Sequence, residues 1–142
     1  MALINLKRSG KSSSILAIMR MIDVMAGKIT IDHVDISTIH GSVVRERVTC
    51  LTQDPFMYSA TIRSNADPLG RSSDHDICSV MKKVGIWDVL SDKASNKDSE
   101  SSVLDNLMDA DFLSHGQRQL FCLGRALLKD GKILILDEPT SR

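Results

Sequence analysis

Near its C-terminal end the sequence reads Ile133-Leu134-Ile135-Leu136-Asp137-Glu138, four apolar residues followed by two carboxylates. A continuous apolar run of this length is typical of a strand buried on both faces of a parallel sheet. Such a strand delivers its last residues to the carboxyl edge of the sheet, where open α/β folds bind ligands. We therefore expect Asp137 and Glu138 to face a ligand, although an acidic turn after any buried strand gives the same pattern.

A second segment has the frame of a phosphate-binding loop. It reads Asn5-Leu6-Lys7-Arg8-Ser9-Gly10-Lys11-Ser12 and fits G-x-x-x-x-G-K-S/T, with Asn5 at the first glycine. In such loops, backbone N–H groups surround phosphate oxygens at the positive end of a helix. The lysine reaches the outer phosphates, and the hydroxyl that follows holds Mg²⁺. The predicted contacts to a nucleotide are Asn5, Arg8, Ser9, Gly10, Lys11, Ser12 and Ser13, with Ser12 also a metal ligand.

Two residues depart from that frame. Asn5 replaces a glycine, and asparagine tolerates a left-handed backbone better than most residues. Arg8 stands where a further glycine is common, and an unfavourable backbone there stores roughly 1–3 kcal/mol of strain. At about 1.4 kcal/mol per tenfold, that strain weakens nucleotide binding by about one to two decades. The alternative is an ordinary Gly-Lys-Ser turn before a helix.

Strands and helices alternate along the rest of the chain. Patterns of β-branched and apolar residues predict strands at 2–4, 28–31, 34–36, 48–51 and 132–136. Helical spacing predicts helices at 12–25, 41–47, 74–90 in two parts divided near Gly85, and from Ser114 to about Lys129. Residues 91–111 are rich in Ser, Asp, Lys and Asn and predict a solvated loop. The alternation favours an α/β fold with parallel core strands.

Composition narrows the class of protein. The 142 residues amount to about one domain, with 42% apolar and 25% charged residues, which suits a globular core. With 18 basic and 18 acidic residues, the balanced charge gives no reason to expect nucleic acid or a polybasic membrane surface as partner. The three cysteines show no metal or disulfide spacing. No apolar run approaches the roughly 20 residues that span a bilayer.

One motif identifies a family. Residues 113–117 read Leu113-Ser114-His115-Gly116-Gln117 and begin a predicted helix ahead of the strand at 132–136. They resemble the L-S-x-G-Q signature of the ATP-binding cassette (ABC) ATPases. The resemblance covers nearly the whole chain and is weakest over residues 91–110. Further matches at Gln53-Asp54-Pro55-Phe56, Thr61-Ile62-Arg63, Asn65 and Asp67-Pro68 are similar to the second nucleotide-binding domain of the C subfamily of exporters, the multidrug-resistance-associated group.

The resemblance implies a P-loop NTPase core with a mainly parallel sheet, from 1–55 and 112–142, and a helical subdomain at about 56–111. It implies that the chain is truncated at both ends, lacking outer strands, an adenine-stacking aromatic residue and a switch histidine. Mg-ATP would be held by the phosphate loop, with Gln53 and Asp137 as metal ligands, and with Gln53 and Glu138 acting on the attacking water. Ser114, Gly116 and Gln117 would contact ATP bound on an opposing domain.

The implied partners are a second nucleotide-binding domain and the transmembrane domains of an exporter, at the cytoplasmic face of a membrane. No nucleic acid and no direct membrane insertion by this chain are expected. We expect weak or no ATPase turnover from the chain alone. The alternative is a non-catalytic fragment or regulatory interaction module derived from such a transporter. A soluble ABC ATPase is disfavoured by the exporter-like pattern from Asp54 to Pro68.

Overall fold

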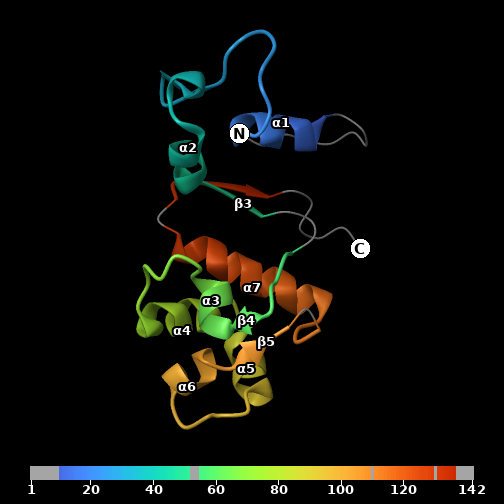
Figure 1. Cartoon of the computed structure of the whole chain (residues 1–142), viewed down its shortest axis with the longest axis vertical. Helices are drawn as coiled ribbons and strands as arrows, with labels where there is room; N and C mark the ends of the chain where they lie inside the picture. Colours follow the sequence, from blue (N-terminus) through green and yellow to red (C-terminus); the bar gives the residue numbers. More distant parts are fainter. Residues whose placement is uncertain (1–9, 52–54, 110, 130, 137–142) are drawn as a thin grey trace. The chain divides into compact units, whose positions relative to one another are not determined.

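The computed structural model describes residues 10–51, 55–109, 111–129 and 131–136. The chain forms two compact units (Figure 1). Residues 1–50 and 131–137 make the first, here named the strand unit, and residues 51–130 and 138–142 make the second, the helical unit. The domain boundaries expected from the sequence, 1–55 and 112–142 against 56–111, stay a prediction.

The strand unit contains a pair of strands that lie side by side. These are β3 (Val48–Leu51) and β6 (Ile133–Leu136), whose arrows point the same way in Figure 1, so the pair is parallel as expected. The other elements of the unit are α1 (Lys11–Ile18), β1 (Thr30–Ile31), β2 (Val34–Asp35), the 3-10 helix η1 (Ile36–Thr38) and α2 (Gly41–Arg47). A helix, a hairpin and a parallel pair together confirm the α/β fold class.

The hairpin of the strand unit is antiparallel, with Thr30 opposite Asp35 and Ile31 opposite Val34. Its two-residue turn is Asp32-His33, whose φ angles of 50° and 68° are both positive. Two positive φ angles match the right-handed twist of a hairpin, which is why glycine and asparagine are the usual residues there. This turn therefore holds two strained residues.

A small core fills the strand unit. Ile36, Val44 and Val48 are buried, and half-buried isoleucines pack around them, among them Ile133 and Ile135 from β6. The alternate residues of β6 are exposed, Leu134 to 43% and Leu136 to 51%. The expectation that this strand is buried on both faces is therefore wrong for the described residues. In β6, therefore, only the face that carries Ile133 and Ile135 packs against this core.

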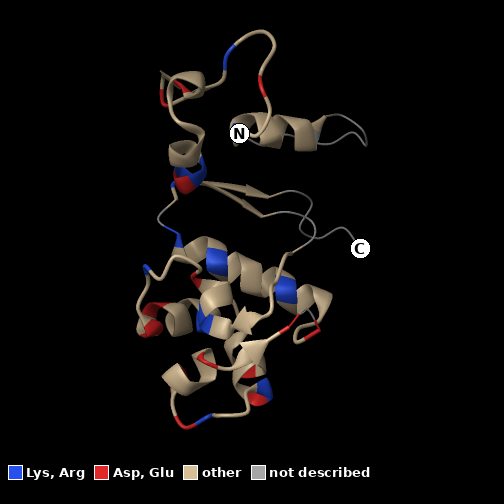
Figure 2. Ribbon diagram, in the orientation of Figure 1, with Lys and Arg blue, Asp and Glu red and all other residues tan. Residues whose placement is uncertain are grey.

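The helical unit has a larger core. It comprises β4 (Ala60–Thr61), α3 (Ile62–Ala66), α4 (Asp74–Lys83), α5 (Trp87–Lys93), α6 (Glu100–Leu104), β5 (Leu107–Met108) and α7 (His115–Leu128). The helix α7 packs on α3 and α4, and a Cβ added to its Gly124 would lie 2.9 Å from the sulfur of Met81. A glycine there lets α7 approach α4 closely. Figure 2 shows that each unit carries both basic and acidic residues.

Two segments differ from the sequence-based expectation. The helix expected to reach Met25 ends at Ile18, where Arg20 turns the chain with φ 53°, and Met25 is 97% exposed. The solvated loop expected at 91–111 instead contains α6 and β5 and buries Val103, Leu104 and Met108. The apolar residues of α6 and β5 form short, separated clusters within a polar segment. The composition of the segment therefore gave no sign of these two elements. The helices α2, α4, α5 and α7 and the strand β3 are confirmed.

Candidate functional site

The start of α1 has the backbone form that a phosphate loop requires. Gly10 is the residue before the helix, with φ 75° and ψ 18°, and provides no capping side chain. A side chain added there would meet nothing within 4 Å, so the positive φ and not crowding explains the glycine. The backbone oxygen of Gly10 accepts from the amide of Ser14 at 2.9 Å, which begins the helical bonds.

The next predicted phosphate ligands come directly after Gly10 in the sequence. Lys11 is the first residue of α1, and Ser12 and Ser13 are exposed in its first turn. This end of the helix carries the positive pole of its dipole and N–H groups directed outward. Asn5, Arg8 and Ser9 lie outside the described residues. The structure therefore brings Gly10, Lys11, Ser12 and Ser13 together at one helix end and leaves the remaining loop contacts as predictions.

A second helix end lies at the predicted signature. Ser114 precedes α7, and its hydroxyl accepts from the amide of Gln117 at 3.4 Å. In return the amide of Ser114 donates to Oε1 of Gln117 at 3.0 Å, which completes a capping box. This reciprocal pair fixes the orientation of the first turn of α7.

Gly116 lies in that first turn and is exposed, and an added Cβ would meet nothing within 4 Å. Glycine inside a helix costs roughly 1 kcal/mol relative to alanine. Among the described residues, crowding does not require a glycine here, because the added Cβ would have open space. The bare backbone at Gly116 is instead suited to close approach by a group from outside the unit.

The remaining predicted residues follow the parallel pair. The strand β3 ends at Leu51, two residues before Gln53, and β6 ends at Leu136, directly before Asp137 and Glu138. Carboxyl ends of parallel neighbours lie at the same edge of a sheet. Gln53, Asp137 and Glu138 themselves lie outside the described residues, so their convergence stays a prediction. Within the described ranges, no group of three His, Cys, Asp or Glu side chains could hold a metal ion.

With these features in place, comparison with known proteins decides the family. Residues 7–141 match the family profile described as ABC transporter. The chain belongs to the ABC transporter family. The matched segment is the ATP-binding domain of these transporters.

Curated relatives agree with this assignment. The chain is 45% identical to the ABC transporter gloK of Glarea lozoyensis over 94% of its own length and 9% of that protein. It is 46% identical to the ABC transporter ecdL of Aspergillus rugulosus over 93% of the chain and 8% of that protein. It is 48% identical to ABC transporter C family member 5 of Arabidopsis thaliana over 94% of the chain and 8% of that protein. The chain thus spans less than a tenth of the length of these transporters, and no helix in the described part is long and apolar enough to cross a membrane.

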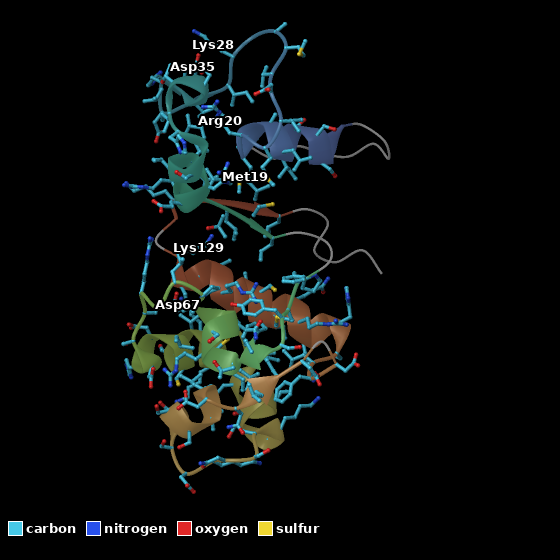
Figure 3. All side chains as sticks on the ribbon, viewed as in Figure 1. Met19, Arg20, Lys28, Asp35, Asp67 and Lys129 are labelled. Carbon is cyan, nitrogen blue, oxygen red and sulfur yellow. The ribbon has the colours of Figure 1, made fainter. Side chains whose placement is uncertain are left out.

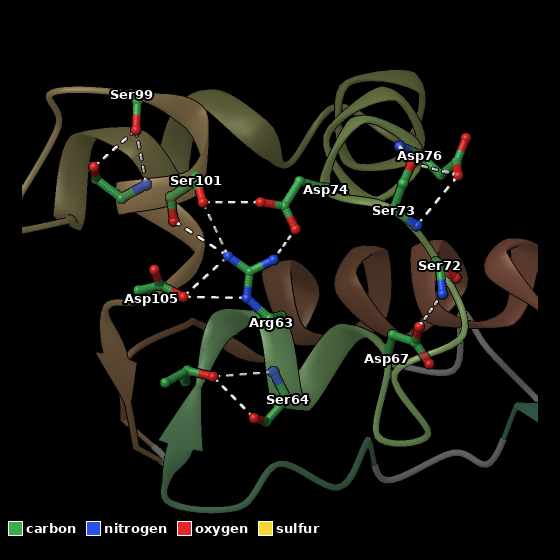
Figure 4. Close-up of polar contacts among 12 residues, drawn as sticks. Arg63, Ser64, Asp67, Ser72, Ser73, Asp74, Asp76, Ser99, Ser101 and Asp105 are labelled. Carbon is green, nitrogen blue, oxygen red and sulfur yellow. Dashed lines mark hydrogen bonds and ion pairs between the residues drawn. The ribbon is translucent and has the colours of Figure 1, made fainter.

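A polar network organises the helical unit of this ABC domain. Arg63 in α3 binds Asp74 at the start of α4, and its Nη2 donates to Asp105 at 3.0 Å and to the hydroxyl of Ser101 at 3.2 Å (Figure 4). The hydroxyl of Ser101 donates to Asp74 at 2.8 Å. One guanidinium therefore joins α3, α4 and the end of α6. The sequence marked Arg63 only through its family resemblance and gave no sign of these partners.

The segment before α3 is fixed by a buried amide. Asn65 is fully buried, and its Nδ2 donates to the backbone oxygens of Tyr58 at 2.9 Å and Thr61 at 3.2 Å. Its Oδ1 accepts from the amide of Tyr58 at 3.2 Å. Asp67, at the end of α3, is partly buried, which would raise the pKa of its carboxyl. Hydrogen bonds from Ser72, together with those from the backbone of Arg71 and Leu69, outweigh this effect and lower the pKa of Asp67 below its ordinary value of 3.8.

A cavity of about 420 Å³ in the strand unit is separate from the predicted phosphate site. Arg20, Lys28 and Asp35 line it, and Figure 3 labels all three. It lies at the C-terminal end of α1, where Ala17 lines it, whereas the predicted phosphate ligands lie at the N-terminal end. Hydrogen bonds from the side chain and backbone of Ser37 lower the pKa of Asp35, so this carboxylate stays charged at neutral pH. No predicted site residue lines this cavity.

Proposed function

We propose that this chain binds Mg-ATP through the phosphate loop that ends in α1. The observation that carries the proposal is the left-handed Gly10 at the start of α1, followed by Lys11 and Ser12. This arrangement turns the first amides of the helix toward an anion, with no side-chain cap from Gly10 in their way. Lys11 neutralises the outer phosphates, and Asn5, Arg8, Ser9 and Ser13 complete the loop.

Ser12, Gln53 and Asp137 are the proposed ligands of the magnesium ion, and the open space at Gly10 is consistent with a bound nucleotide. When bound, the ion neutralises charge on the phosphates. Glu138 orients and polarises the attacking water and accepts its proton as general base, with Gln53 beside it. These roles are shared between two parts of the strand unit, the start of α1 and the residues that follow the β3–β6 pair.

The proposed catalytic site is composite. Ser114, Gly116 and Gln117 contact a phosphate of ATP held by a second nucleotide-binding domain, which the open backbone at Gly116 supports. Hydrolysis in such a site drives export through transmembrane domains, with this domain at the cytoplasmic face of the membrane. Because the site needs a second domain, and because Arg8 replaces a glycine, we expect weak or no turnover from the isolated chain.

Titration with Mg-ATP tests the proposal. Lys11→Ala removes the phosphate-binding cation and is expected to weaken binding by at least about tenfold, the loss of roughly 1.4 kcal/mol. The matched control is Lys28→Ala, an exposed lysine of the same unit, which should bind as the wild type does. Equal and negligible binding by wild type and Lys11→Ala would reject the proposal and favour a non-catalytic fragment or regulatory interaction module.

Turnover is measured separately by phosphate release from Mg-ATP. The isolated chain is expected to release little phosphate above background. Robust release that Glu138→Gln abolishes would contradict the expected weak turnover while supporting Glu138 as the general base. Robust release that Glu138→Gln leaves unchanged would contradict the assigned role of Glu138.

A further inference from the structure

The C-terminal end of α1 is held by an arginine from a distant helix. Beyond Ile18 the chain leaves the helix through Met19 and Arg20, so their carbonyls lack helical partners. Nη1 of Arg45, in α2, donates to the backbone oxygen of Met19 at 3.2 Å and lies 3.5 Å from that of Arg20. A cation at this end also interacts favourably with the helix dipole. Figure 3 labels Met19 and Arg20 where the chain approaches α2.

A glycine makes room for this contact. A Cβ added to Gly41, at the start of α2, would lie 2.8 Å from Nη1 of Arg45 and 3.5 Å from Cβ of Arg20. The first distance is shorter than any ordinary contact to a Cβ. A Cβ here would require the end of the Arg45 side chain to shift, so the glycine leaves room for the guanidinium in the position it occupies.

Arg20 completes the connection in the opposite direction. Its Nη1 donates to the backbone oxygens of Ile36 at 3.2 Å, Ser37 at 2.9 Å and Ile39 at 2.5 Å. The exit of α1 is therefore bonded to η1 through the Arg20 side chain and to α2 through the Arg45 side chain. We name these contacts the two-arginine tie.

We infer that Arg45 is a positioning residue for the magnesium part of the proposed site. The helix α2 continues directly into β3, whose neighbour β6 ends before Asp137, while α1 begins with Lys11 and Ser12. An eight-residue helix is a rod of about 12 Å, so a shift at its C-terminal end tilts its first turn. The tie therefore sets the place of Ser12 relative to the β3–β6 pair. This inference rests on the proposed function.

Magnesium is the sensitive ligand in this arrangement. Phosphate oxygens are bound at the start of α1, so their contacts there follow α1 itself. The metal is shared between Ser12 on α1 and Asp137 after β6, so its affinity depends on the spacing that Arg45 maintains. Residues that orient metal ligands typically change metal affinity by roughly 10–100-fold when they are removed.

The test measures ATP affinity of the full 142-residue chain with Mg²⁺ and with EDTA, and takes the ratio as the magnesium gain. Arg45→Ala is expected to reduce this gain by roughly tenfold and to leave the affinity in EDTA unchanged. Arg47→Ala is the matched control, because Arg47 is an exposed arginine of the same helix, and it should keep the full gain.

A second variant keeps the test decisive if Arg45→Ala fails to fold. Gly41→Ala keeps every donor and acceptor but displaces the guanidinium, and it should also reduce the magnesium gain. If Gly41→Ala keeps the full gain, or if folded Arg45→Ala does, the positioning role is overturned while the proposed function stands. If the wild type shows no magnesium gain, the proposed magnesium site is wrong and the inference falls with it.

Discussion

In the helical unit Phe121, Ile62 and Met81 are completely buried, at the centre of a cluster that α3, α4, α5 and α7 all enter. In the strand unit the described core is Ile36, Val44 and Val48, with half-buried isoleucines around them. Burial of apolar area is the main favourable contribution to folding. The helical unit therefore has the larger share of this stabilisation among the described residues.

The strand unit depends more on polar connections. Its two-arginine tie joins α1, η1 and α2 through side chain-to-carbonyl bonds, while apolar residues after α1, such as Met21 and Met25, are 62% and 97% exposed. Regions with few buried apolar contacts open locally at low free energy. The helical unit therefore combines a large apolar core with its polar network, whereas the strand unit, whose described core is smaller, relies more on the two-arginine tie.

The largest expected effect follows from the packed core. Phe121→Ala should lower the free energy of unfolding of the helical unit by about 3–5 kcal/mol, because it removes a fully buried ring and leaves a cavity. Urea unfolding followed by the fluorescence of Trp87, the single tryptophan, measures this unit. Leu107→Ala, at a residue 75% exposed, is the control. Equal losses for the two variants would contradict the role given to core packing.

A smaller loss is expected from the polar network of the same unit. Arg63→Ala removes the bonds to Asp74, Asp105 and Ser101. Because the Arg63 side chain is 32% exposed and screened by solvent, the expected loss is roughly 1–2 kcal/mol. The same urea titration measures it, with Lys83→Ala, an exposed lysine of α4, as control. A loss as large as that of Phe121→Ala would show that packing is not the main support of this unit.

In the strand unit, two residues with positive φ allow a matched test. His33→Gly relieves a φ of 68° in the hairpin turn and should stabilise the unit by about 0.5 kcal/mol. Arg20→Gly relieves a φ of 53° but removes three bonds to carbonyls, so it should destabilise by a net of about 1 kcal/mol. Hydrogen exchange of the Ile31 and Val34 amides reports both. Stabilisation by Arg20→Gly would refute the importance of the tie.

Local signals were enough to predict much of this fold from the sequence. The serine cap at Ser114 and the β-branched run at Val48 set the start of α7 and the strand β3 within a residue of expectation. For the candidate site, the sequence located Gly10 and the serine that begins α7, because both depend on neighbouring residues. A sequence pattern predicts those features that depend on interactions between residues close together in the chain.

Contacts between distant residues were not predictable in this way. The helix α1 ends at Ile18, where Arg45, some 26 positions away in sequence, bonds the exit of the helix. The apolar residues beyond Ile18 continued the helical spacing and gave no sign of this contact. Burial of Val103, Leu104 and Met108 likewise depends on the helices around them. Gly41 is a local trace of the tie, but its meaning required the position of the Arg45 guanidinium.

A last, small effect separates charge from packing in the helical unit. Hydrogen bonds from Ser72, Arg71 and Leu69 together outweigh burial and depress the pKa of Asp67 below 3.8 in the folded state. The stabilisation is therefore complete above pH 3.8 and is lost as the pH falls through the lower folded pKa. Asp67→Asn should therefore be less stable than the wild type at pH 7, by about 1 kcal/mol or less, with the difference shrinking below pH 3.8. Trp87-monitored urea titrations at several pH values measure this. A difference that stays constant as the pH falls would mean that Asp67 acts through shape and not through its charge.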